Sequence, residues 1–125
     1  MGRWLVAAGL SGLVAVAVGA FAAHGLAGRL AAANLAWIET GARDEMYHAL
    51  ALLGVALLAR ERPGRAVAAA GWCFVAGTVL FCGSLYLLGL TGIMAFAWAT
   101  PLGGLGFLAG WAALAIQGFR LWRRP

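Results

Sequence analysis

The sequence has few charged side chains and no lysine at all. Only 10% of its 125 residues are charged, whereas 64% are apolar; soluble domains usually have about 25% and about 45–50%. A soluble chain of this length would expose large apolar patches. The composition therefore excludes an ordinary soluble fold, and the length predicts a single membrane domain over residues 1–125.

Recognisable catalytic and cofactor motifs are also lacking. Cys73 and Cys82 share one apolar run, point to opposite faces of a helix and so cannot bridge each other. There is no CxxC, no HExxH, no phosphate-binding glycine loop and no Ser-His-acid set on a familiar scaffold. We therefore expect a protein that is not an enzyme and carries no metal or other cofactor.

All nine basic residues behind the net charge of +5 are arginines. These arginines stand in short clusters between long apolar runs, without the interleaved aromatic residues of a nucleic-acid surface. We expect no nucleic acid partner. Exclusive use of arginine, with abundant alanine and glycine, is typical of a GC-rich bacterial genome.

The apolar runs predict an all-α protein with four transmembrane helices. The second run, Met46 to Ala59, rises only about 21 Å, so it must extend back to about Thr40 to cross a core of about 30 Å. An amphipathic segment after the first span, residues 26–37, is expected to form an additional interfacial helix. Thr100 and Pro101 are typical of the N-cap and first residue of the last helix. The predicted spans are 4–23, 40–59, 66–89 and 101–119.

The arginines also predict the orientation. If the N-terminus is inside, Arg29 and Arg43 are outside, and the other seven are inside. Such a bias places both termini and the central turn in the cytoplasm of a bacterial inner membrane.

Small residues at four-residue spacing predict where helices approach closely. In lipid, such approach supplies the dispersion energy that holds helices together. The predicted packing residues are Ala15, Gly19 and Ala23, then Ala69, Cys73 and Gly77, then Gly106 and Gly110.

One polar cluster is the candidate functional site, at the outer half of the bundle. Glu39, Arg43 and Tyr47 repeat every four residues and share one helical face, while His24 and His48 lie near helix ends. Ionisable groups drawn into a bilayer are costly and need partners.

Several interpretations of this cluster remain open. In the structural one, Glu39 pairs with Arg43, His48 is hydrogen-bonded inside the bundle, and His24 caps a helix. The others are two histidines binding haem or a metal, a site for a quinone, lipid headgroup or other small molecule, and a proton or substrate relay. No predicted apolar run contains an acidic or basic residue near mid-membrane, which disfavours an ion-coupled exporter.

Four stretches resemble a known family of small membrane proteins. They are GAFAAHGL from Gly19, ETGAR and MYHALALL from Glu39 and Met46, LFCGSLYLL from Leu80, and TPLGGLGFLAGW from Thr100. The chain resembles the family grouped as domain of unknown function 423, which includes the eukaryotic transmembrane protein 256. The resemblance implies a four-helix membrane protein without an established molecular function. Asp44, Glu45 and Cys82 depart from the family pattern, so no role is carried over to them.

Together these observations predict a non-catalytic accessory, assembly or scaffolding component of the membrane. Its partners are the lipid bilayer and either another membrane protein or further copies of itself. The alternative is a small-molecule-binding or proton-handling protein that uses the polar cluster.

Overall fold

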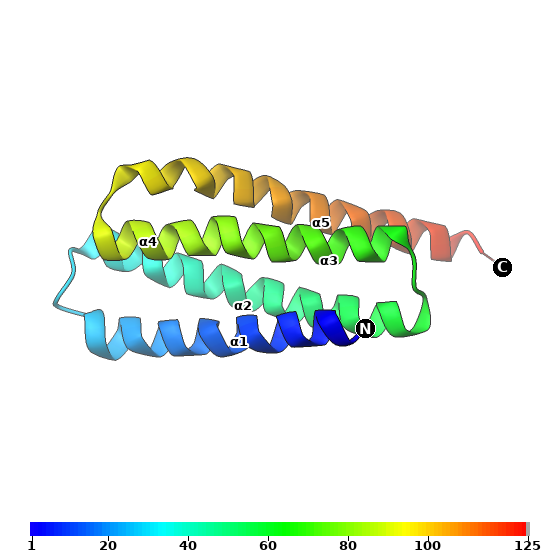
Figure 1. Ribbon diagram of the computed structural model, residues 1–125, viewed down its shortest axis with the longest axis horizontal. Helices are drawn as coiled ribbons and strands as arrows, with labels where there is room; N and C mark the ends of the chain where they lie inside the picture. The colour runs from blue at the N-terminus through cyan, green and yellow to red at the C-terminus, as the bar shows by residue number, and fades with distance from the viewer. Residues whose placement is uncertain (125) are drawn as a thin grey trace.

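The computed structural model describes residues 1–124, which form four antiparallel helical rods (Figure 1). The first rod is α1 (Gly2–Phe21) with a π-helical turn, η1 (Ala22–Leu26), and the second is α2 (Ala32–Glu61). The third joins α3 (Arg65–Gly77), a π-helical segment η2 (Thr78–Cys82) and α4 (Gly83–Thr91). The fourth is a short 3-10 turn, η3 (Met94–Trp98), followed by α5 (Ala99–Trp122).

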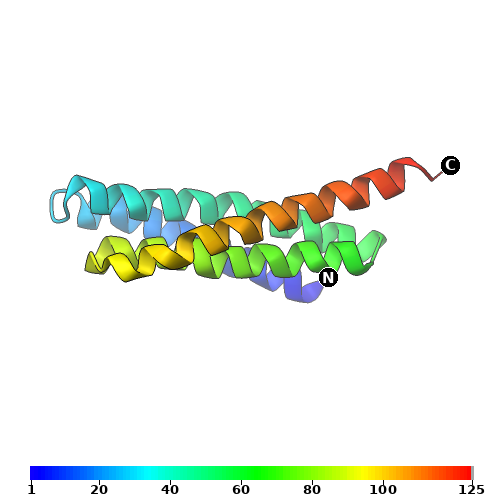
Figure 2. The same cartoon turned by 90° about the horizontal axis from the view of Figure 1, so that it is seen from above.

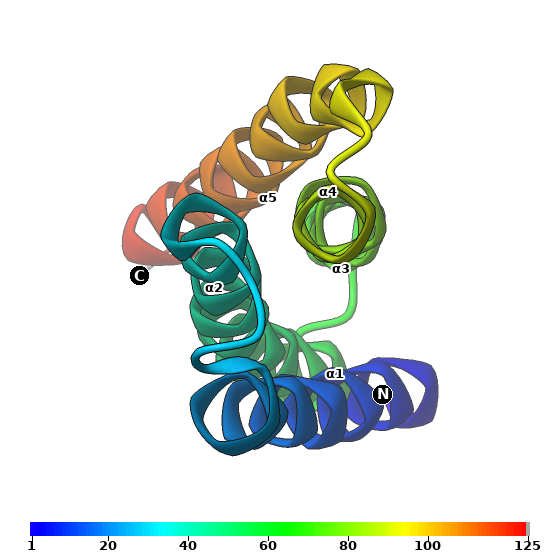
Figure 3. The same cartoon turned by 90° about the vertical axis from the view of Figure 1, so that its left-hand side faces the viewer.

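The rods run up and down the length of the molecule. Both termini and the turn at residues 62–64 lie at one end, here named the terminal end; the turns at 27–31 and 92–93 lie at the other, the distal end (Figure 1). Seen from above, α5 crosses the rods beneath it obliquely (Figure 2). Seen from the distal end, α1 lies along α2, and α5 lies along the rod of α3 and α4 (Figure 3).

Three of the rods are long and apolar enough to cross a membrane: Gly2–Leu26, Arg65–Thr91 and Met94–Trp122. The all-α class predicted from the sequence is confirmed. The remaining rod, α2, has 30 residues but a lower mean hydropathy because it carries acidic and basic side chains.

The separate interfacial helix predicted at residues 26–37 does not form. Leu26 ends the first rod, a short turn follows, and Ala32 already begins α2, which continues without a break to Glu61. Gly28 adopts a positive φ of 78° in this turn, a conformation that glycine allows without strain. Residues 32–37 are therefore the first turns of a long helix, because no breaker separates them from the second apolar run.

The helix ends follow local chemistry, with one exception. Pro63 and Gly64 stop α2, and Gly92, at φ 69°, closes α4 while its N–H bonds the carbonyl of Leu88. The predicted N-cap at Thr100 is wrong. A 3-10 turn leads straight into α5, and the hydroxyl of Thr100 lies 2.6 Å from the hydroxyl of Ser84 on α4 instead.

Glycines bring α5 against the third rod. A Cβ on Gly103 would overlap the backbone of Phe81, and one on Gly106 would lie 3.2 Å from the Cα of Gly77. A Cβ on Gly110 would lie 2.6 Å from the ring of Phe74. Close contact here depends on the missing side chains.

Of the small residues predicted to pack on the first rod, only the first faces a neighbouring helix. Ala15 is buried, but a Cβ on Gly19 would meet no atom within 4 Å, and Ala23 is exposed. Gly12 faces α2 instead, with its Cβ position 4.0 Å from that of Ala49. On α3, Ala69 is exposed and Cys73 half-buried.

The apolar core extends through the terminal half of the bundle. Trp4 fills the space left by Gly71 and packs edge-on against Trp72, with ring centroids 5.2 Å apart. Fully buried side chains from the second and third rods complete the core: Leu52, Val55, Val67 and Phe74.

Candidate functional site

The five residues of the predicted polar cluster do not converge in the structure. Glu39, Arg43 and Tyr47 do share one face of α2, as expected, but that face is exposed. His24 is exposed in η1 at the distal end. Only His48 is buried, so the cluster separates into an exposed stripe and one core histidine.

His48 is held by two hydrogen bonds inside the bundle. Its Nδ1 lies 2.7 Å from the carbonyl oxygen of Asp44, one turn earlier on α2. The indole Nε1–H of Trp111, from α5, donates to its Nε2 at 3.2 Å. Since a carbonyl accepts and an indole donates, the arrangement selects the neutral imidazole with its proton on Nδ1.

Aromatic rings enclose the same histidine. The ring of Phe107 stacks on it at a centroid distance of 3.5 Å and an angle of 5°, and Phe74 packs at 5.6 Å. Both ring nitrogens and one ring face are therefore occupied by side chains or backbone of the bundle. This favours the structural interpretation of His48, in which it ties α2 to α5.

A second buried polar pair was missed by the sequence analysis. The hydroxyl of Tyr86 on α4 donates to Oε2 of Glu45 on α2 at 2.5 Å, and Glu45 is only 5% exposed. Glu45 precedes His48 by three residues, so helical spacing was a signal that both share the inner face. Because α2 begins eight residues before the predicted span, Glu45 lies in the middle of this helix and not near its start.

Two hydroxyl groups complete the polar interior. Ser84 bonds both Thr100 and the carbonyl of Phe81, which links α4 to the start of α5. Thr78, in η2, is 8% exposed, and its Oγ1 has no hydrogen-bond partner among residues 1–124. Nothing in the sequence distinguished Thr78 from an ordinary helical threonine.

The histidines and cysteines are not arranged as metal ligands. In the part of the chain that the structure describes, no three His, Cys, Asp or Glu side chains are grouped to hold an ion. Cys73 and Cys82 are both free thiols.

The long apolar rods and the polar interior define an α-helical membrane protein. Within that class, a family model described as protein of unknown function (DUF423) matches residues 18–104. The chain belongs to this family.

Curated relatives match almost the whole chain. The UPF0382 inner membrane protein YgdD of Escherichia coli (strain K12) is 41% identical over 96% of this chain and 92% of its own length. A UPF0382 membrane protein of Haemophilus influenzae is 43% identical over 94% of both chains, and the UPF0382 membrane protein YwdK of Bacillus subtilis is 42% identical over 90% and 93%. No solved structure matches this chain.

Proposed function

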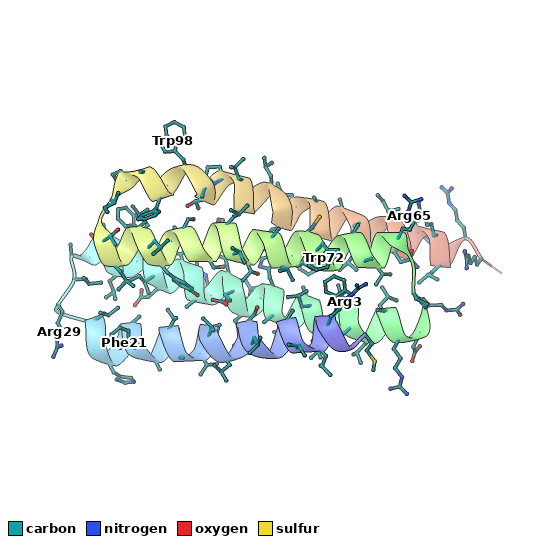
Figure 4. All side chains as sticks on the ribbon, viewed as in Figure 1. Arg3, Phe21, Arg29, Arg65, Trp72 and Trp98 are labelled. Atoms are coloured by element: carbon teal, nitrogen blue, oxygen red, sulfur yellow. The ribbon has the colours of Figure 1, made fainter. Side chains whose placement is uncertain are left out.

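We propose that the protein crosses a bacterial inner membrane four times, with both termini in the cytoplasm. In this arrangement α2 crosses the membrane in addition to the three apolar rods. A 30-residue helix is about 45 Å long, more than the hydrocarbon core requires. It also lies along α1 and packs against the rod of α3 and α4 (Figures 1 and 3). Arginines support the orientation: seven lie towards the terminal end, and Arg29 is at the distal end (Figure 4).

The exposed stripe of α2 supports a role as an accessory component. Arg43 lies two residues from Gly41, which contacts Tyr86 and the backbone of Cys82, well inside the third rod. An exposed arginine at this depth faces hydrocarbon, where a charged side chain costs about 3 kcal/mol or more. Another membrane protein that carries a complementary group would remove this cost.

The accessory role therefore depends on one observation: Glu39, Arg43 and Tyr47 are exposed on one face of a membrane helix. The role is non-catalytic, since the buried imidazole of His48 is engaged on both nitrogens by the bundle itself.

The test is photo-crosslinking in cells. A photoreactive amino acid in place of Tyr47 should give a discrete protein adduct, whereas the same substitution at Leu108, an exposed position on α5, should give lipid adducts only. Changing Glu39 and Arg43 together to leucine should remove the Tyr47 adduct. An adduct of twice the monomer mass identifies a second copy as the partner. Lipid adducts alone from both positions would contradict the accessory role.

A second candidate function is the binding of a small membrane-soluble molecule. It is favoured by a groove of about 380 Å³ between α1 and the third rod, because His24, Glu39 and Arg43 do not converge.

A further inference from the structure

A pocket lies at the terminal end, between the turn that joins α2 to α3 and the end of α5. It has a volume of about 300 Å³, and its accessible wall is more polar than apolar. Four arginines line it from two sides: Arg62 and Arg65 beside the turn, and Arg120 and Arg124 at the end of α5. Figure 4 shows Arg65 at this end of the bundle, where α5 also ends. Residues far apart in the chain thus bring four guanidinium groups to one cavity.

The lining of this pocket has an excess of positive charge. Glu61 is the only carboxylate that residues 1–124 contribute to it, and Gln117 adds an amide. All four arginine side chains are exposed, so their N–H donors are accessible to a ligand. A guanidinium group presents these donors in a planar fork that matches the oxygens of a phosphate or carboxylate. The pocket therefore suits an anion.

Membrane orientation alone does not explain why these arginines converge. An orientation signal requires arginines near the ends of the spans, but it does not require them to share a cavity. Arg60 and Arg123 lie at the same end of the bundle and outside the lining of the pocket. The four lining arginines are therefore a distinct group, selected by the packing of α5 beside α3.

The start of α3 adds backbone donors at the edge of the pocket. Gly64 is the N-cap of this helix and makes no side-chain hydrogen bond to its first turn, and both Gly64 and Arg65 line the pocket. The first N–H groups of a helix have no acceptor within the helix, and its positive dipole end favours an anion. This helix end supplements the guanidinium groups, which carry the charge of the site.

An apolar groove continues from the pocket along α5. It has a volume of about 300 Å³ and is lined by Ile116, Phe119, Arg120 and Arg123, so Arg120 belongs to both the pocket and the groove. Trp122, 82% exposed, marks this level as the headgroup layer, where tryptophan is enriched. A phospholipid with its phosphate in the pocket would place an acyl chain in the groove, whereas a free phosphate would leave the groove without a ligand.

We propose that this pocket binds the phosphate of an anionic phospholipid headgroup, such as that of phosphatidylglycerol. Basic pockets between transmembrane helices are known to bind anionic headgroups. Phosphatidylcholine has the same phosphate but also a cationic amine, which four arginines repel. The charge of the lining therefore selects the anionic lipid, and the adjoining groove selects a lipid over a free phosphate.

Binding can be measured by calorimetry on the purified full-length protein in dodecyl maltoside at low salt. The probe is dioctanoyl phosphatidylglycerol. Dioctanoyl phosphatidylcholine controls for entry of the lipid into the detergent micelle, and inorganic phosphate tests the other source of the anion. We expect saturable binding of phosphatidylglycerol only. Equal heats from the two lipids would overturn the proposal, and inorganic phosphate that binds as tightly as phosphatidylglycerol would overturn the lipid assignment.

Three single variants separate the pocket from the general positive charge of this end. Arg65→Gln and Arg120→Gln, on opposite walls, should each weaken phosphatidylglycerol binding about tenfold (1.4 kcal/mol). Arg60→Gln removes the same charge outside the lining and should leave binding unchanged. All three side chains are exposed, so circular dichroism should show an intact helical fold in each variant.

Equal weakening in all three variants would overturn the pocket, because binding would then follow the overall charge of this end. Full binding in both Arg65→Gln and Arg120→Gln would overturn it as well. The titration is made in detergent and with the exposed stripe of α2 intact. Its outcome is therefore independent of the orientation in the membrane and of the Tyr47 adduct.

Discussion

Two buried polar side chains of this bundle have opposite hydrogen-bond environments. His48 receives a hydrogen bond from Trp111 and bonds the carbonyl of Asp44. Thr78 has no partner within residues 1–124. Burial removes water from both groups, so the hydrogen-bonded His48 contributes to stability and the unpartnered hydroxyl of Thr78 opposes it.

Replacing Trp111 with phenylalanine should destabilise the bundle by about 1 kcal/mol, because Nε2 of His48 loses its donor. The loss is measured as the shift in unfolding free energy by circular dichroism in mixed detergent. Trp98→Phe is the matched control: Trp98 is 82% exposed and projects outward from η3 (Figure 4), so its loss should change little. Equal shifts for the two variants would argue against a hydrogen-bonded role for His48.

Helix pairs in this protein meet through glycine on one side and an aromatic ring on the other. Gly71 accommodates Trp4, Gly110 accommodates Phe74, and Gly103 allows the backbone of Phe81 to approach α5. Rings then fill the space that the missing side chains leave, which provides dispersion energy without a hydrophobic driving force.

Gly103→Ala should destabilise the protein by about 1–3 kcal/mol, because the added methyl group would meet backbone atoms of Phe81 that cannot rotate away. Gly118→Ala on the same helix should be neutral or slightly stabilising, since no atom lies within 4 Å of its Cβ position. Gly19→Ala should behave like Gly118→Ala, although its spacing suggested a packing role. Thermal unfolding of the three variants distinguishes contact glycines from lipid-facing ones.

Arginine and tryptophan side chains lie close together at the terminal end. Arg3 lies over the ring of Trp4 at 4.7 Å and near that of Trp72 at 5.9 Å, and Figure 4 shows it beside Trp72. Such cation–π contacts favour an interfacial position. The distal end carries Arg29, with Phe21 nearby on the lipid-facing side (Figure 4).

Cysteine labelling tests the orientation of the four rods. In a background with Cys73 and Cys82 replaced by alanine, Ala31→Cys at the distal turn should react with a membrane-impermeant maleimide in intact cells. Gly64→Cys at the terminal end should react only after permeabilisation, because a cluster of seven arginines favours the cytoplasmic side. Its φ of 176° is compatible with cysteine. Reversed labelling would overturn the orientation, and labelling of both positions in intact cells would exclude α2 as a crossing.

The helical class, the apolar rods and the turn at Pro63-Gly64 could be predicted from the sequence. Each depends on residues close together in the chain: the length of an apolar run, a proline, or a cluster of arginines. The start of α2 could not be placed, because residues 26–37 are amphipathic and suit an interfacial helix and a long rod equally well.

The exposed stripe of α2 illustrates what local sequence determines. Glu39, Arg43 and Tyr47 share a face because 3.6 residues complete a helical turn. Which face of α2 turns inward depends instead on the neighbours: Tyr86 pairs with Glu45, Trp111 pairs with His48, and Gly41 leaves room for the Tyr86 ring. Periodicity fixes only relative directions around one helix. The absolute direction is set by these contacts between residues far apart in the chain.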